Sequence, residues 1–388
     1  MGIQQNNDRI QTTHIGSLPR PHDLLDFMKA KFAKQPYDDK AYQAKLSKAV
    51  ADCVRKQVDC GIDFVTDGEF SKPGFFTYVQ ERLEGFEARP NQKLILFQKE
   101  VSSFPEYYAE YFKQAMMGGT IVPITPVACV GPVKYRGERL LQIDIENLKA
   151  AAKAAGVPEK KAFLPATAPS GVGINEYYKT GEEFRIAIAD ALHEEYRAIV
   201  DAGFLLQIDD PFLVTYYITR PDLDIAACRK WAELRVEALN AALSGIPADR
   251  IRFHTCYSIN MGPRIHDMQL KDIVDIILKV RAGAYSFEAA NPRHEHEWED
   301  WQRIKIPDDK ILIPGVITQS TVLVEHPELV AQRLARFASV AGRERVIAGA
   351  DCGFASFAGS NEVHPSIVWA KFNALVDGAR LASRQLWP

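Results

Sequence analysis

Four side chains in the second half of the chain are of types that bind metal ions. His254 and Cys256 lie two positions apart in an apolar run, and residues i and i+2 of a strand point to the same side. Glu288 stands inside another apolar run, where a buried carboxylate is costly unless it is paired or bound to a metal. Cys352 follows a third apolar run. An imidazole, two thiolates and a carboxylate suit tetrahedral Zn²⁺, so we expect one zinc ion on His254, Cys256, Glu288 and Cys352.

A zinc site of this composition favours one kind of chemistry. Two thiolates and a carboxylate give it a net negative charge, which makes the ion a weak Lewis acid for hydrolysis. The ion still binds an incoming thiol and keeps it deprotonated, and the thiolate is the nucleophile. Glu288 is the weakest of these ligands for zinc, and we expect the incoming thiol to displace it. The prediction is alkylation of a thiol; the alternatives are a closed structural zinc site and a buried thiol beside a core histidine.

Eight short apolar runs alternate with helical patterns along the chain. We expect strands at residues 9–18, 62–69, 161–170, 204–211, 250–258, 284–291, 310–317 and 345–354. We expect helices at residues 39–60, from 75, 181–202, 224–243, 271–281, 296–304, 326–340 and 365–383. This alternation predicts an α/β protein with a parallel sheet, and eight units favour a closed (β/α)8 TIM barrel as one domain over 1–388. Residues 87–155 do not fit the alternation and are expected to form an insertion after strand two. The first turn lacks the GxGxxG motif of the competing open Rossmann sheet.

Polar side chains stand where six of the expected strands end. They are Ser17, Glu69, Asp209, His254, Cys256, Glu288 and Cys352. In a barrel of this kind the catalytic groups lie at the C-terminal ends of the strands. We therefore expect these side chains to surround one site.

The composition excludes several classes of protein. The 388 residues are 47% hydrophobic and 25% charged, with a net charge of −3, which offers no positive field for nucleic acid or an anionic membrane. No apolar run approaches the ~18 residues that span a bilayer. The six cysteines are scattered and suggest no disulfide framework. With no apolar segment at its start, we expect a cytoplasmic protein.

The chain resembles the cobalamin-independent methionine synthase family, as a stand-alone form of its C-terminal catalytic half. The motifs that carry the resemblance are TTHIGS at 12–17, DGE at 67–69, QIDDP at 207–211, HTCYS at 254–258, FEA at 287–289 and DCG at 351–353. The resemblance implies a (β/α)8 barrel with a catalytic zinc that transfers a methyl group from methyltetrahydrofolate to homocysteine. It places the zinc on His254, Cys256, Glu288 and Cys352. It places the amino-acid end of homocysteine against Ile15, Gly16, Ser17, Glu69 and Asp209.

The residue types agree with that placement of homocysteine. Glu69 and Asp209 are carboxylates that can hold an ammonium group, and the backbone and hydroxyl at Gly16 and Ser17 can hold a carboxylate. The alternative is local: Ser17 caps the following turn, and Asp209 forms an Asx turn before Pro211.

The part of the family pattern that binds the methyl donor has changed in this chain. Residues 212–215 contain no acid, and Tyr177 and Tyr178 stand in place of a tryptophan. Residues 315–321 carry no histidine where the family has its proton donor. We therefore expect His294 or His326 to be the catalytic acid, and a donor other than methylfolate, such as a sulfonium compound or a corrinoid protein. The alternative reaction is epoxide opening by a coenzyme M-type thiol, which would need Arg or Lys, rather than Glu69 and Asp209, to bind the sulfonate.

Overall fold

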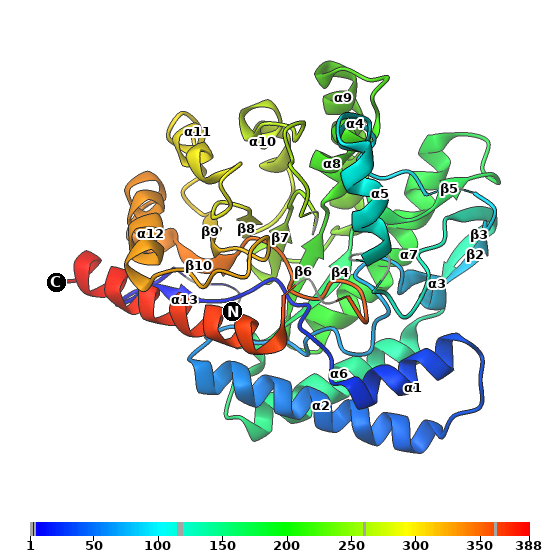
Figure 1. The fold of residues 1–388 in the computed structure, drawn as a ribbon, viewed down its shortest axis with the longest axis horizontal. Coiled ribbons are helices and arrows are strands. Elements are labelled where there is room, and N and C mark those ends of the chain that lie inside the picture. Colours follow the sequence, from blue (N-terminus) through cyan, green and yellow to red (C-terminus); the bar gives the residue numbers. More distant parts are fainter. Residues whose placement is uncertain (1–2, 4, 93, 115–118, 259–260, 361–362) are drawn as a thin grey trace.

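A curled, seven-stranded parallel sheet forms the centre of the protein (Figure 1), with strand order β1-β10-β9-β8-β7-β6-β4. The computed structural model describes residues 3, 5–92, 94–114, 119–258, 261–360 and 363–388. The strands of this sheet are β1 (Gln11–Thr12), β4 (Phe163–Thr167), β6 (Leu205–Asp209), β7 (Ile251–His254), β8 (Ala284–Phe287), β9 (Ile311–Ile317) and β10 (Ile347–Ala350). A second, smaller sheet has the order β2-β3-β5 and contains β2 (Leu83–Ala88), β3 (Val127–Tyr135) and β5 (Ile174–Asn175).

Thirteen α-helices occur in the described part of the chain, and the long ones lie outside the curled sheet (Figure 1). They are α1 (His22–Phe32), α2 (Asp39–Cys60), α3 (Val79–Arg82), α4 (Gln98–Ser103), α5 (Pro105–Gln114), α6 (Glu138–Ala154), α7 (Gly181–Asp201), α8 (Phe212–Thr219), α9 (Ile225–Ala242), α10 (Val274–Ile277), α11 (Trp298–Gln302), α12 (Pro327–Ala341) and α13 (Pro365–Leu386). None of the helices in these ranges is both long and apolar enough to cross a membrane.

The predicted α/β class is confirmed, but the second expected strand is wrong. Between 62 and 69 the chain makes only one bridge, from Val65 to Ala162, and Phe64 N donates to Thr12 O at 3.1 Å. The backbone then turns, because Gly68 and Glu69 have φ values of +72° and +58°, which a strand does not allow. The sheet therefore has seven regular strands, and a complete eight-stranded barrel is not confirmed.

Helix α2 shows how local sequence sets an element. Asp38 precedes it, and its side chain accepts a hydrogen bond from Ala41 N, as an N-cap does. Gly61 ends it in the left-handed region at φ +92°, where a side chain would be strained. Between these two signals an apolar stripe that includes Leu46, Val50 and Val54 is buried.

Strands β6, β7 and β8 are buried along their whole length, as expected for a parallel sheet covered on both faces. Parallel pairing sets Asp209 opposite His254, and His254 opposite Ser286. The C-terminal ends of these neighbouring strands therefore lie at the same edge of the sheet, and they carry polar side chains there.

The range expected to be an insertion, 87–155, divides into two parts in the structure. Its first part contains the end of β2, then α4, α5 and β3, and α4 packs against both α5 and α8 (Figure 1). Its last part is α6, which packs against α2 in the outer layer of helices. Sequence reasoning did not predict α1 or α8. The helix expected from 75 begins at Val79 as α3, and the helix expected at 271–281 is shorter, as α10.

Candidate metal and thiol-binding site

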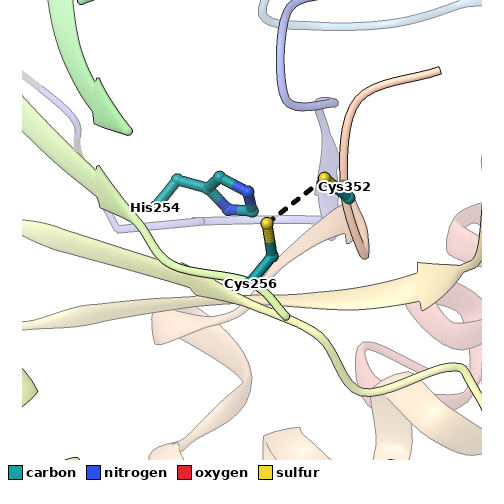
Figure 2. Close-up of side chains that lie close together, drawn as sticks. All are labelled: His254, Cys256 and Cys352. Atoms are coloured by element: carbon teal, nitrogen blue, oxygen red, sulfur yellow. Dashed lines mark hydrogen bonds between the residues drawn. The ribbon is translucent and has the colours of Figure 1, made fainter. Parts of the chain in front are cut away.

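Three of the four predicted metal ligands come together at one point of the fold. The ligand atoms of His254, Cys256 and Cys352 all lie within 4.8 Å of one another, and Figure 2 shows the three side chains pointing toward one another. The two sulfur atoms are 3.2 Å apart, which is too long for a disulfide bond. His254 ends β7 and Cys256 follows two residues later, whereas Cys352 follows β10. Two separate strand ends thus supply the group, and His254 and Cys256 share a side as their i, i+2 spacing predicted.

The group of three fits a metal ion. Both ring nitrogens of His254 are buried and make no hydrogen bond to the described residues, although buried polar atoms are nearly always paired. Burial, reinforced by the charge of Arg252, lowers the pKa of His254 to about 3, which leaves the neutral imidazole that metals bind. The hydrogen bond with Cys352, together with burial, raises the pKa of Cys256 well above its usual value. A cation between the two sulfurs would offset the cost of the thiolate form.

Glu288, the fourth predicted ligand, lies near His254, Cys256 and Cys352 in the fold but does not belong to this group of three. Its Oε1 accepts a hydrogen bond from Tyr257 N at 2.7 Å. Its Oε2 accepts from Arg264 Nη2 at 3.0 Å and from Asn291 Nδ2 at 2.5 Å. Glu288 as a metal ligand therefore stays a prediction, and the structure shows it paired with Arg264.

A small cavity opens against His254, Cys256 and Cys352. Its lining consists of Ile15, Ser17, Glu69, Phe75, Asp209, Pro211, His254, Cys256, Ser258, Cys352, Gly353 and Ser356. Four of the five residues predicted to hold homocysteine are among them. Gly16 is the fifth: its backbone has φ +136°, and a Cβ there would lie 2.7 Å from Pro165 Cγ and 3.1 Å from Glu69 Oε1. Only glycine therefore allows the backbone at position 16 to lie this close to the Glu69 side chain.

Two carboxylates share the cavity. Burial, followed by the nearby charge of Glu69, raises the pKa of Asp209 well above its usual value. Gln207 Nε2 donates to Asp209 Oδ1 at 2.8 Å, and Lys72 Nζ lies 3.6 Å from Glu69 Oε2. Lys72 is buried behind Glu69, where it also donates to Pro165 O, and it does not line the cavity. Two buried carboxylates facing one space form an environment that a bound cation would stabilise.

One wall of the cavity is aromatic. Phe75 lines it and packs in an edge-to-face contact against Phe76, with ring centroids 5.0 Å apart. Phe212 and Phe357 lie within 6.2 Å and 5.8 Å of the Phe75 ring. These rings form an apolar cluster behind Phe75, which is the aromatic residue of the cavity lining. A larger cavity lies among α1, α2 and α6, and His254, Cys256 and Cys352 do not line it.

The two histidines predicted as catalytic acids have other surroundings. His294 is buried, with Nε2 3.0 Å from Asp267 Oδ2 and Nδ1 2.9 Å from Glu297 Oε2. Its ring stacks on that of Tyr257, with centroids 3.7 Å apart. His326 is exposed and caps α12 by accepting from Glu328 N. Neither is among the described residues that line the cavity, so their role as acids stays a prediction.

We expect His294 to make stability depend on pH. Burial lowers the pKa of His294, but its hydrogen bonds to Asp267 and Glu297 outweigh burial and raise the pKa to about 9. Because the folded pKa exceeds the unfolded value of about 6.5, the stabilisation is complete below pH ~6.5 and is lost as pH rises through ~9. This contribution is on the order of 3 kcal/mol. The stability of His294→Gln, measured by thermal or urea unfolding across this pH range, should not show that decline.

The matched control for this measurement is His22→Gln, because His22 is exposed at the start of α1. That variant should keep the pH dependence of the unmodified protein. An equal decline in stability for His294→Gln and the unmodified protein would contradict the assignment.

Sequence reasoning missed Arg264 and Lys72. Arg264 is 3% exposed and pairs with Glu288 and Asp267, and it lies in a loop for which no strand or helix was expected. Lys72 is also 3% exposed, three positions after Glu69. The only signal for Lys72 was its closeness in sequence to a predicted strand end, and Arg264 gave none.

Comparisons with known proteins identify the family of the chain. The model of the family described as cobalamin-independent synthase, catalytic domain, matches residues 10–123 and 178–371. A methionine synthase of Thermococcus kodakarensis is 24% identical over 382 residues, covering 97% of this chain and 94% of the relative. A 2-hydroxypropyl-CoM lyase of Xanthobacter autotrophicus is 24% identical over 418 residues, covering 100% and 98%. A B12-independent methionine synthase structure from Shewanella sp. W3-18-1 has the same fold, with a TM-score of 0.72 at 19% identity over 97% of this chain and 99% of that one.

These comparisons bear on two expectations. Several relatives are named as methyltransferases or as cobalamin- or B12-independent synthases, and one is named as a lyase. These names support an enzyme that acts on small molecules. The same names argue against a corrinoid protein as the methyl donor, and that expectation is withdrawn. The family match spans most of the chain and includes His254, Cys256 and Cys352. The chain belongs to the cobalamin-independent methionine synthase family.

Proposed function

We propose that the protein is a cytoplasmic, zinc-dependent methyltransferase that activates homocysteine as a thiolate and methylates it to methionine. The observation that carries this proposal is one small cavity that joins two kinds of group. One histidine and two cysteines that could hold a metal ion line it together with the carboxylates of Glu69 and Asp209. A molecule with a thiol at one end and an ammonium group at the other fits that arrangement.

The protein's own side chains have distinct tasks in this proposal. His254, Cys256 and Cys352 would hold Zn²⁺, which lowers the pKa of a bound thiol and so supplies the nucleophile. Glu69 and Asp209 bind the ammonium group and fix the distance from it to the sulfur. The aromatic wall around Phe75 keeps water away from the reacting sulfur, so that the electrophile meets no competing nucleophile.

The charges in the cavity support an amino-acid substrate. The raised pKa of Asp209 has burial as its main cause and the charge of Glu69 as the next. An ammonium group between the two carboxylates would relieve that repulsion and favour the ionised form of Asp209. The carboxylate of the same substrate would meet the hydroxyl of Ser17, which lies in the cavity, and the backbone at Gly16.

We expect Glu69→Gln and Asp209→Asn each to weaken homocysteine binding about 10- to 100-fold, because a hydrogen bond to a charged group contributes roughly 1.5–3 kcal/mol. Both variants should still bind one zinc ion, since neither residue belongs to the metal-ligating group. Calorimetric titration of the zinc-loaded variants with homocysteine measures the first expectation, and metal analysis measures the second.

The matched control is Glu87→Gln, an exposed carboxylate on β2, which should bind homocysteine like the unmodified protein. Unchanged affinity for homocysteine in both cavity variants would contradict an amino-acid substrate.

One alternative has an observation in its favour. The 2-hydroxypropyl-CoM lyase relative matches over the whole chain, and its name implies a thiol with a sulfonate in place of an amino acid. Such a substrate needs a cation in the cavity, and the lining residues are Glu69 and Asp209 instead. Coenzyme M binding in the same titration, in preference to homocysteine, would select the alternative.

A further inference from the structure

Arg20 is a buried arginine that joins three segments of the chain beside the cavity. It is 6% exposed and lies in the segment between β1 and α1. Its Nη2 donates to Glu69 O at 2.6 Å and to Lys72 O at 2.8 Å, and its Nη1 donates to Ala355 O at 3.0 Å. Burial lowers the pKa of Arg20 to about 10, against the nearby charges of Glu69 and Asp67. The guanidinium group is therefore charged at neutral pH and binds the backbone of two loops at once.

The first of these loops carries Glu69 in a conformation that needs support. The backbone of Glu69 has φ +58°, which residues other than glycine adopt rarely and which costs free energy. Arg20 Nη2 holds the carbonyl of Glu69, and Asp67 Oδ1 accepts a hydrogen bond from Glu69 N at 2.9 Å. Leu18 N also donates to Gly68 O at 3.1 Å. These bonds hold the turn that presents the Glu69 side chain to the cavity.

The second loop carries Cys352. Ala355, which accepts from the guanidinium group, lies three positions after Cys352. Phe354 N donates to Ser17 O at 3.1 Å, so this loop is bonded to the same segment that carries the arginine. A Cβ at Gly353 would overlap Ser17 Oγ, and the two backbones can lie this close because position 353 is glycine. Both Cys352 and Gly353 line the cavity.

The two loops also pair with each other directly. Phe75 N donates to Ser356 O at 3.0 Å, and Ala358 N donates to Pro73 O at 2.9 Å. Arg20 extends this pairing to the residues that precede these positions in both loops. The two loops therefore form one unit around the guanidinium group.

A fixed distance between the two loops has a chemical consequence. A thiol amino acid with its sulfur near Cys352 and its ammonium group near Glu69 has to span the space between the loops. Homocysteine and cysteine carry the same groups and differ in length by one methylene. A site of fixed length therefore favours one of them, and one methylene typically changes such a preference by about 10- to 200-fold.

We propose that Arg20 is a positioning residue that ties the loop of Glu69 to the loop of Cys352 and thereby makes the site selective for a thiol amino acid with the chain length of homocysteine. This inference rests on the proposed function and adds the residue that sets the length of the substrate. Arg20 is not among the described residues that line the cavity, so it acts through the two loops.

The first test compares homocysteine with cysteine by calorimetric titration of the zinc-loaded protein. The unmodified protein should bind homocysteine at least about tenfold more tightly than cysteine. In Arg20→Met the three carbonyls lose their donor and the loops can shift, so the preference should fall to about threefold or less. A merely structural role would weaken the binding of both thiols equally. An unchanged ratio of the two affinities in Arg20→Met would therefore overturn the inference.

A second variant and a control accompany this test. Arg20→Lys is the milder change: it keeps the charge, but an ammonium group does not reproduce the rigid fork of a guanidinium, so it should also lose most of the preference. Full preference in Arg20→Lys would show that the charge suffices and would overturn the inference. Arg250→Met is the matched control, because Arg250 Nη2 donates to Phe204 O at the opposite end of the strands. It should keep the preference, and an equal loss there would also overturn the inference.

The second test needs neither metal nor thiol. Leu18 N and Phe354 N donate the hydrogen bonds that join the segment of Arg20 to the two loops. Hydrogen–deuterium exchange at these two amides should be about tenfold or more faster in Arg20→Met than in the unmodified protein, because local opening costs less. The amides of α2 should exchange as before. Unchanged exchange at both Leu18 and Phe354 would show that Arg20 does not hold the loops together.

Failure of the proposed function would look different. If the unmodified protein binds no zinc or no homocysteine, the proposed function fails before the variants are compared. If the unmodified protein binds homocysteine and cysteine equally well, or if the ratio is unchanged in Arg20→Met, only the inference about Arg20 fails.

Discussion

Replacing either cysteine of the metal-ligating group should remove nearly all bound zinc. Cys256→Ser and Cys352→Ser each exchange a thiolate for a hydroxyl that is a far poorer ligand for zinc, and thiolates supply much of the affinity of such sites. We expect one zinc ion per chain in the unmodified protein and less than about a tenth of that in either variant after dialysis. Elemental analysis of the purified proteins measures this directly.

The matched control is Cys53→Ser, because Cys53 is a buried free cysteine in α2, away from the group of three. That variant should keep its zinc even if it is less stable. Full zinc content in both Cys256→Ser and Cys352→Ser would contradict the assignment of the site.

The second large effect concerns the methyl donor. The nitrogen that carries the methyl group of methylfolate is a poor leaving group unless it is protonated, so transfer needs a positioned acid, which contributes typically 10²–10⁴-fold. The cavity offers the hydroxyls of Ser17, Ser258 and Ser356, while Glu69 and Asp209 are assigned to the substrate's ammonium group. We therefore expect methyltetrahydrofolate, with one or several glutamates, to be a weak donor or none.

A sulfonium donor needs no such acid, because its leaving group departs as a neutral sulfide. We expect S-methylmethionine or a similar sulfonium compound to methylate homocysteine at least about 100-fold faster than methylfolate does. A donor screen with zinc-loaded protein, followed by detection of methionine, measures the ratio. Turnover with polyglutamated methylfolate at ~1 s⁻¹ or more would contradict this expectation.

The sequence predicted the structure best where the determining residues are neighbours in the chain. A histidine and a cysteine two positions apart at a strand end predicted their shared orientation, and His254 and Cys256 do face the same partner, Cys352. Long helices with clear caps were equally predictable: α2 was expected at 39–60 and spans Asp39–Cys60. In both cases the information is local, since it depends on the period of a strand or on the residues at helix ends.

Features that depend on contacts between distant segments could not be predicted. Arg264 pairs with Glu288 across 24 positions, and Glu100 reaches Arg264 across 164. No sequence pattern near Arg264 indicates that it pairs with Glu288. The sequence indicated only that the buried carboxylate of Glu288 needs a partner or a metal ion. The expected strand at 62–69 failed for a different, local reason: its apolar residues are buried, but the left-handed backbone at Gly68 and Glu69 bends the chain.

The most direct test of the account is the number of sulfur atoms around the metal before and after homocysteine is added. X-ray absorption at the zinc edge of the loaded protein counts them without any methyl donor. The account predicts two sulfur neighbours from Cys256 and Cys352 in the resting protein, and a third when homocysteine is bound. A sulfur count that does not change at saturating homocysteine would contradict the claim that this site activates a thiol.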